Sequence, residues 1–367
     1  MIAAAATFFL RHAMEAAMTA SDGTVGDPRG GPLGGKRLLV EVVGEGPRAA
    51  PAPRGPRWWR ERSRLTRVLL KLGVAALVAG TVAKWTVVPT LVHEIDTDVA
   101  FEPIVAPEGG SAAVAITAAL IDREVNTHRW VPNDPWFMPT DVLDNMPNFQ
   151  QGVLRASSWF TLELLDQIGR VRGPAGNDRD LERAAGLLQF PPDVWVIDPE
   201  TSLLPSATSE DQYRAALTLL KNYNDRVAEG RAVFELRADA LATTLRRMSV
   251  DLGAQAAEID RMQDGAGWML NRQADDLFYA NKGMLYAYRM ILGGLGSDFE
   301  SIVAGRGIGN AWAQVLADLE RGAQLRPAVV LNADSDTSVF ANHLMLQGFY
   351  MKRAILQLEE VVNTLAV

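Results

Sequence analysis

The longest apolar segment of the chain lies between residues 68 and 92 and reads VLLKLGVAALVAGTVAKWTVVPTLV. A helix over this range would rise about 37 Å, which exceeds the roughly 30 Å of a bilayer's hydrocarbon core. Lys71 lies within one turn of the start, where its ammonium can extend to the headgroups. Lys84 costs more because it lies nearer the middle, and Trp85 marks the far interface. The pattern predicts a transmembrane helix.

Basic residues precede this segment and acidic residues follow it. Arg64 and Arg67 end a run of six arginines that also includes Trp58 and Trp59, whereas Glu94, Asp96 and Asp98 come after the segment. The positive-inside rule then places the N-terminus in the cytoplasm and the rest of the chain outside it. The alternative, a buried helix of a soluble core, would require all six arginines to lead into that core.

Beyond residue 101 the apolar positions recur mainly at helical spacing. We expect helices at 111–125, 149–169, 180–190, 209–262 with a break near Gly230, 268–292 and 310–324. The run Val194–Ile197 is the one segment that favours a strand. The prediction is therefore an all-α fold, in which one N-terminal transmembrane helix is followed by a large helical-bundle domain.

The last helix carries a narrow apolar stripe with alternating spacings of four and three residues. Its members are Leu344, Gly348, Met351, Ile355, Leu358, Val362 and Leu365. Such a stripe is typical of helices that pack along their length. It indicates either a seam inside the bundle or the interface of a homo-oligomer.

Composition and charge divide the chain into three parts. Residues 1–65 form a Gly-, Pro- and Arg-rich cytoplasmic tail with a basic run, residues 66–92 form the span, and residues 93–367 form the bundle domain. Residues 1–92 hold 13 Lys and Arg against 6 Asp and Glu, which leaves 23 basic and 38 acidic residues, a net charge of −15, for the remainder. So acidic a domain repels phosphate backbones, and we expect no nucleic-acid partner.

Few residues point to catalysis. The chain has no cysteine, and its four histidines (His12, His93, His128 and His343) are too far apart in sequence for a zinc motif, so we expect no metal site and no cofactor. Helix ends explain the glycines at 293–296 and 305–309 better than a phosphate-binding loop does. Paired carboxylates near aromatic residues (Asp122 with Glu124, Asp141 with Asp144, and Asp275 with Asp276) are the strongest indication of an enzyme, one that cleaves glycans.

A long segment without helical period, residues 128–150, is the strongest candidate for a binding surface. It combines aromatic side chains with Pro, Asn and Asp, and it either binds a partner or pins itself onto the helical core. The candidate residues are His128, Trp130, Asn133, Asp134, Trp136, Asp144, Asn145 and Asn148.

Several short stretches, taken in order after the apolar segment, resemble a known family. They are His93–Asp98, Ile121–Asn126, His128–Asp134, Asp144–Gln150 and Asp275–Tyr279. Together they resemble the bacterial domain of unknown function 2333 over residues 66–366. The resemblance implies an envelope protein of proteobacteria and supplies no catalytic residues. Thr97 stands where members of that family carry a second Asp, which speaks against a cation site here.

The expected location is the bacterial inner membrane, with the N-terminus cytoplasmic and the C-terminal domain periplasmic. The expected function is a non-catalytic scaffold or interaction protein of the cell envelope. The expected partners are membrane lipid around the span and a protein of the envelope. The alternative is a periplasmic hydrolase that acts on envelope glycan or peptide through paired carboxylates.

Overall fold

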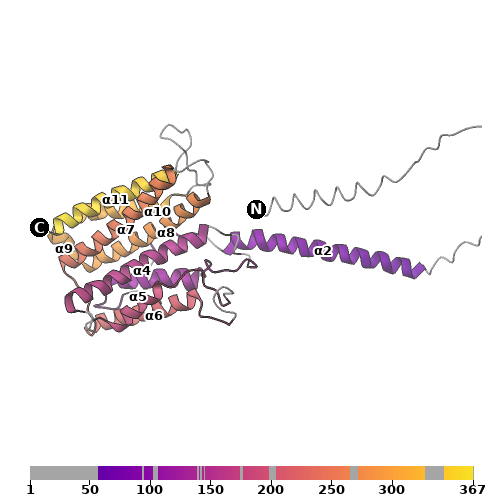
Figure 1. The fold of residues 1–367 in the computed structure, drawn as a ribbon, viewed down its shortest axis with the longest axis horizontal. Coiled ribbons are helices and arrows are strands. Elements are labelled where there is room, and N and C mark those ends of the chain that lie inside the picture. Colours follow the sequence, from indigo (N-terminus) through magenta and orange to yellow (C-terminus); the bar gives the residue numbers. More distant parts are fainter. Residues whose placement is uncertain are drawn as a thin grey trace, which may run out of the picture. The chain divides into compact units, whose positions relative to one another are not determined.

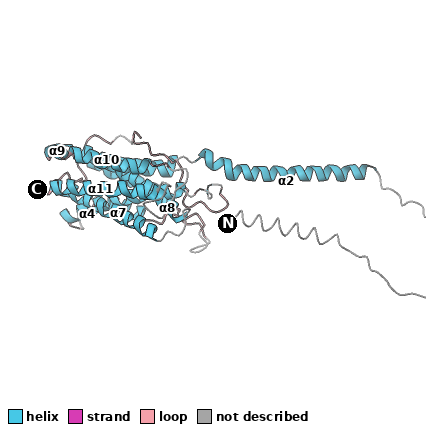
Figure 2. Cartoon of the chain, turned by 90° about the horizontal axis from the view of Figure 1, so that it is seen from above, coloured by secondary structure: helices cyan, strands magenta, loops and turns pink. Residues whose placement is uncertain are grey.

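The structure is a computed structural model, and every regular element that it describes is a helix (Figures 1 and 2). The described residues are 57–92, 95–101, 106–138, 140, 143, 145–173, 177–197, 204–264, 272–326 and 343–366. Among them no strand occurs. The run Val194–Ile197 is an irregular loop, so the expected strand is wrong. The carbonyl of Val194 accepts hydrogen bonds from Asn133 and from the backbone and side chain of Ser209, which satisfy it without a neighbouring strand.

Helix α2 spans Arg57–Val92 and contains the predicted membrane segment. Its window Arg64–Ala83 has the length and composition of a membrane span, with a mean hydropathy of 1.7, and none of the window is buried. The helix continues past Pro89 to Val92. Within α2 the side chains are described for residues 64–83, so those of Lys84 and Trp85 lie outside the described set.

The bundle domain consists of ten helical elements in the described ranges. They are α3 Ala112–Asp122, η1 Arg123–Thr127, α4 Asn145–Arg172, α5 Arg179–Leu188, α6 Ser209–Ala228, α7 Ala238–Asp264, α8 Arg272–Asp298, α9 Glu300–Gly305, α10 Gly309–Gln324 and α11 His343–Leu365. Most of the predicted helices are present, with ends that shift by up to about six residues. The predicted break near Gly230 is also present, because that glycine adopts a positive φ between α6 and α7.

Side-chain caps fix where several of these helices begin. The Ser111 hydroxyl accepts a hydrogen bond from the Val114 amide, and the Asp298 carboxylate accepts from Ser111 Oγ and from the amides of Ala112 and Ala113. An acceptor at this position satisfies amides that have no partner within the helix. Asp298 ends α8, so the same contacts tie the end of α8 to the start of α3.

Helix α8 lies at the centre of the bundle and contacts α3, α4 and α10. Glycines allow two of these helices to approach it closely. A Cβ on Gly152 of α4 would lie 2.0 Å from the Ala280 carbonyl oxygen, and one on Gly294 would lie 2.7 Å from Ala113 Cα. Gly294 and Gly296, where a Cβ would meet Ala113 and Trp312, are therefore packing positions near the end of α8. Because α8 continues through Gly293, Gly294 and Gly296 to Asp298, the expectation that they end a helix is wrong. Gly305, Gly307 and Gly309 do lie at helix ends.

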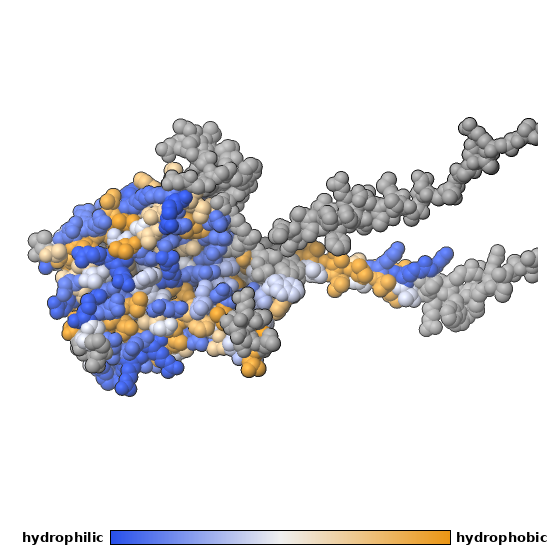
Figure 3. Space-filling model, in the orientation of Figure 1, coloured by the Kyte–Doolittle hydropathy of each residue, from blue (hydrophilic) through white to orange (hydrophobic). Residues whose placement is uncertain are grey.

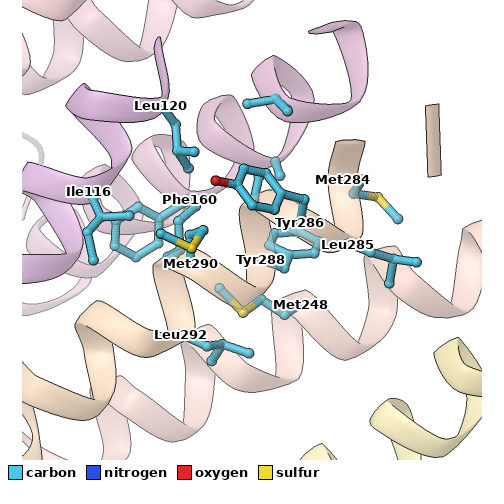
Figure 4. Packing of buried hydrophobic residues seen from close by; sticks show 14 of the residues in the cluster. Ile116, Leu120, Phe160, Met248, Met284, Leu285, Tyr286, Tyr288, Met290 and Leu292 are labelled. Atoms are coloured by element: carbon cyan, nitrogen blue, oxygen red, sulfur yellow. The ribbon is translucent and has the colours of Figure 1, made fainter. Parts of the chain in front are cut away.

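The core is built from long apolar and aromatic side chains of α3, α4, α7 and α8. Figure 4 shows Phe160 of α4 and Met248 of α7 beside Tyr288 and Met290 of α8. All four are buried, as are most positions of the final-helix stripe. Helix α11 packs against α7 and α10. The stripe is thus a seam inside the bundle.

Candidate functional site

The most unusual group of polar residues lies where the chain enters the bundle domain after α2. Asp96, Arg123, Glu124, His128 and Tyr286, here called the Arg123 cluster, come from the segment 95–101, the turn η1, the residue that follows it, and α8. Arg123 and Glu124 are each only 2% exposed. Charged side chains are almost never buried this deeply unless they are paired.

Arg123 makes contacts in every direction available to its guanidinium. Nε and Nη2 donate to Glu124 Oε1 at 2.9 and 2.7 Å, and Nη1 donates to Tyr286 Oη at 2.7 Å. Nη1 also lies 3.6 Å from Asp96 Oδ2. The Tyr286 hydroxyl in turn donates to the Asp98 carbonyl at 2.7 Å. The cluster therefore fastens the segment 95–101 to α8.

Burial and the neighbouring charges shift the pKa values of Arg123 and Tyr286 in opposite directions. Burial alone would lower the pKa of Arg123, but the neighbouring Glu124 carboxylate, with Tyr286 and Asp96, raises it overall. Burial raises the pKa of Tyr286 to about 12, and the Arg123 charge partly offsets this rise. At neutral pH the cluster accordingly holds a guanidinium and a neutral phenol.

Arg123 and Glu124 begin a π-helical turn, Arg123–Thr127, which continues directly from α3 and in which both side chains are buried. Gln150 of α4 supports the turn. Its Nε2 donates to the carbonyls of Glu124 and Arg129 at 3.1 and 2.8 Å, and its Oε1 accepts from the Val131 amide. Arg129, next to the turn, has a positive φ of 62°.

His128, the remaining member of the cluster, is half-buried. Its Nδ1 lies 3.6 Å from Glu124 Oε2, which is too long for a hydrogen bond. Both atoms are buried without a hydrogen-bond partner within the described part of the chain. No group of three or more metal-ligating side chains comes together among the described residues. Thr97, at the position of the missing second Asp, is buried, and its hydroxyl has no partner among those residues either.

Two of the predicted binding residues instead hold their loop onto the core. Trp130 is 2% exposed, donates from Nε1 to the Pro192 carbonyl at 2.9 Å, and packs edge-on against Tyr213. Asn133 is also buried and donates to the Val194 carbonyl and to Glu210. These contacts pin residues 128–134 to the start of α6 and to the loop that precedes it.

The polar residues that follow are also paired. Asp134 accepts from Arg129 and from the Thr140 hydroxyl, and Asn148 donates to Asp276 at 2.8 Å. Asn145 is the first residue of α4 and is half-buried. Asp144 lies outside the described residues.

Trp136 differs from these residues, because it is 77% exposed. It packs edge-on against Phe137, which packs edge-on against Trp195 from the loop between α5 and α6. Exposed apolar side chains continue along that second loop. We call the whole set the aromatic patch: Trp136, Phe137, Trp195, Val196, Ile197 and Leu204. Of these residues, Trp136 was among the site candidates predicted from the sequence, and the others were not.

Of the carboxylates considered for an enzyme, the structure describes Asp122, Glu124, Asp275 and Asp276. Asp122 contacts Lys221 and Asn126, Glu124 contacts Arg123, and Asp276 contacts Asn148. Glu124 is thus paired within η1, whereas Asp122 and Asp276 also contact residues of other helices, Lys221 of α6 and Asn148 of α4. Asp141 and Asp144 lie outside the described residues.

A separate apolar cleft of about 480 Å³ lies along α4. Trp159, Leu162, Phe190 and Met284 form much of its wall, and Arg155 lies at its edge, paired with Asp251 at 2.9 Å. None of the predicted site residues borders it. Its size and lining suit a small apolar group.

Comparison with known proteins gives one match. A family model described as "Uncharacterized protein conserved in bacteria (DUF2333)" matches residues 108–267 and 255–365. No curated protein and no solved structure gives a significant match.

Proposed function

The chain belongs to this uncharacterized bacterial family, and from that premise we propose that it is a single-pass inner-membrane protein whose periplasmic bundle has a non-catalytic interaction role. The exposed apolar surface of α2 carries this proposal. Leu70, Leu72 and Leu77 are exposed, none of the window Arg64–Ala83 is buried among the described residues, and Figure 3 shows hydrophobic surface along α2. A soluble protein would leave this surface in water, whereas a bilayer covers it.

The polar groups of α2 also suit a bilayer. The Thr81 hydroxyl donates to the Leu77 carbonyl at 2.8 Å, so it needs no water inside the hydrocarbon. Arg64 and Arg67 lie at one end of the apolar window, and Lys71 lies one turn further in, where it can extend toward headgroups. Basic residues at this end support a cytoplasmic N-terminus.

Labelling of single cysteines tests this topology directly, because the natural chain has no cysteine. We expect Ser301→Cys, an exposed position between α8 and α10, to react with a membrane-impermeant maleimide in spheroplasts. Ser63→Cys, before the span, should react only after lysis. Reaction of Ser63→Cys in intact spheroplasts would refute the orientation, and release of the protein by alkaline carbonate would refute the span.

The interaction role is supported by exposed apolar residues on the outer face of α11. Leu346, Phe349 and Leu356 are exposed and lie on the face opposite to the internal seam. They could contact an envelope protein or a second copy of the chain. Crosslinking in native membranes, followed by recovery through a C-terminal tag, separates these two partners by mass. The variant Phe349→Ser with Leu356→Ser should lose the crosslinked species, and its retention would contradict a role for this face.

The hydrolase alternative has less support. Catalysis by two carboxylates needs them roughly 5–10 Å apart across a substrate. The described carboxylates Asp122, Glu124 and Asp276 are each paired with a different neighbour. We therefore propose binding, and not hydrolysis, as the role of the bundle.

A further inference from the structure

The aromatic patch is an apolar surface without cover in the described structure. Trp136 is 77% exposed and Leu204 is 74% exposed. The patch is nevertheless well defined, because Phe137 joins Trp136 to Trp195 through two edge-on ring contacts. A hydrogen bond of 2.9 Å from the Ser206 amide to the Val196 carbonyl holds the second loop against itself.

The loops that carry the patch are held firmly to the bundle. Trp130 and Asn133 fix the first loop through Pro192 and Val194 of the second. Trp195 therefore follows directly after a residue to which the first loop is bonded. Rigid support of this kind allows exposed rings to be presented without collapsing onto the core.

The aromatic patch and the segment 96–99, which precedes the first helix of the bundle, lie at the same end of the bundle. The segment 96–99 borders a cleft with Gln324 and Arg326 at the end of α10, and it contacts Arg123 just after the end of α3. Trp136 and Phe137 lie between η1, which follows α3, and the start of α4, and Trp195 lies just before the start of α6. Figure 1 shows the loops before α4 and α6 at the end of the bundle opposite to the C-terminus.

Chain connectivity brings this end close to the membrane. Only residues 93 and 94 separate Val92, the last residue of α2, from Ile95. Consecutive Cα atoms are 3.8 Å apart, so Ile95 lies at most about 11 Å from Val92. The Arg123 cluster then fixes the following residues to the bundle. A span that ends at the outer interface therefore holds the patch-bearing end beside the lipid.

We infer that the aromatic patch inserts into the outer leaflet of the membrane in which α2 is anchored, as a second point of contact between the domain and the lipid. This inference rests on the proposed span. Trp and Phe are side chains that favour the membrane interface. Attraction between charges does not drive the contact, because residues 93–367 carry a net charge of −15. The short tether supplies a high effective concentration of lipid, so a weak apolar contact is enough.

The test uses the full chain in vesicles of phosphatidylethanolamine and phosphatidylglycerol whose acyl chains carry bromine atoms near the headgroup. An environment-sensitive fluorophore is attached to one of three single cysteines: Leu204→Cys in the patch, Ala76→Cys in α2, or Ser301→Cys at the opposite end of the bundle. Leu204→Cys leaves all three rings in place. The same label is also placed in a Trp136→Ser, Phe137→Ser background.

We expect strong quenching of the label at residue 204, little at residue 301, and little dependence on salt. In the Trp136→Ser, Phe137→Ser background, quenching at residue 204 should fall to the level at residue 301. Quenching at residue 76 without quenching at residue 204 would overturn the inference but remain consistent with the span. The patch would then be a surface for a protein partner. Absence of quenching at residue 76 would instead refute the span, and with it the inference.

Discussion

Arg123 and Tyr286 are joined in two ways, because the guanidinium donates a 2.7 Å hydrogen bond to the phenol oxygen and also lies 4.7 Å from the centre of the same ring. The two residues are 163 positions apart in the chain. Through the Tyr286 hydroxyl this contact extends to Asp98. The start of the domain is thereby attached to its central helix.

Replacement of Arg123 should destabilise the domain strongly. Arg123→Met leaves the Glu124 carboxylate buried without its partner, and we expect the free energy of unfolding to fall by about 3–5 kcal/mol. Urea denaturation of the full chain in detergent measures this change. The matched control is Arg237→Met, because the ion pair of Arg237 with Asp239 is exposed, and it should change stability by less than about 0.5 kcal/mol. Equal effects of the two variants would contradict a structural role for the cluster.

The crossing of α4 and α8 should not tolerate a methyl group at Gly152. In Gly152→Ala the new Cβ would lie 2.0 Å from the Ala280 carbonyl oxygen, so the two helices must separate. We expect a loss of about 2 kcal/mol or more. Gly186→Ala is the control, because this exposed position in α5 has open space around it, and there the substitution should stabilise by about 0.5–1 kcal/mol. Thermal unfolding of the two variants distinguishes the outcomes, and a stable Gly152→Ala protein would mean that the helices do not cross this closely.

Lys282 should give the domain a measurable pH dependence. Its ammonium is buried and donates to the carbonyls of Ala323 and Leu325 at the end of α10. Burial, with a contribution from Arg326, lowers its pKa to about 8, against 10.5 for an ordinary lysine. Above pH 8 the unfolded chain therefore keeps a proton that the folded chain has lost, and the stability contribution of Lys282 rises with pH.

The comparison with Lys282→Met isolates this effect. Below pH 8 both states of the natural chain are protonated, so the difference in stability between the two proteins should be constant. Between pH 8 and about pH 9.5 the natural chain should gain about 2 kcal/mol relative to the variant. Denaturant titrations at a series of pH values measure the difference. A difference that stays flat across this range would show that Lys282 keeps its ordinary pKa.

Two tryptophans only six positions apart should behave in opposite ways. Trp130→Ala removes a buried ring that packs on Tyr213, and we expect it to cost about 3–5 kcal/mol. Trp136→Ala removes an exposed ring, and stability should change by less than about 1 kcal/mol. Chemical denaturation checks both values. Comparable losses would indicate that Trp136 packs against the domain.

The sequence contained enough information to predict the helices but not the contacts between distant parts. The seam on α11 could be read directly, because Leu344, Met351 and Leu358 repeat at a spacing that one helix face imposes. Gly294 and Gly296 were misread, since their role depends on Ala113 of α3 and Trp312 of α10. The π turn at Arg123 was not foreseen, because local propensity does not distinguish it from an ordinary helical turn.

The same limit applies to the candidate surface, because the sequence indicates the segment but not the contacts of its side chains. Aromatic residues in a Pro- and Asn-rich segment drew attention to residues 128–150, and a binding role for this segment stays a prediction. Whether each ring points inward or outward depends on partners such as Tyr213 and Trp195, which come from segments about 60–80 positions away. No periodicity in the segment itself encodes that choice. The extension of the patch onto the second loop was therefore missed.

The attachment of residues 96–98 to Arg123 and Tyr286 also limits how far the protein can work from the membrane. A domain on a long flexible linker could sweep through the depth of the periplasm, but here the chain is fastened four residues after α2 ends. A helix of 27 residues such as α8 is about 40 Å long. If α2 spans the bilayer as proposed, the bundle works in a layer next to the lipid whose depth is of the order of this helix length. That placement would favour membrane proteins as partners over components anchored deeper in the cell wall.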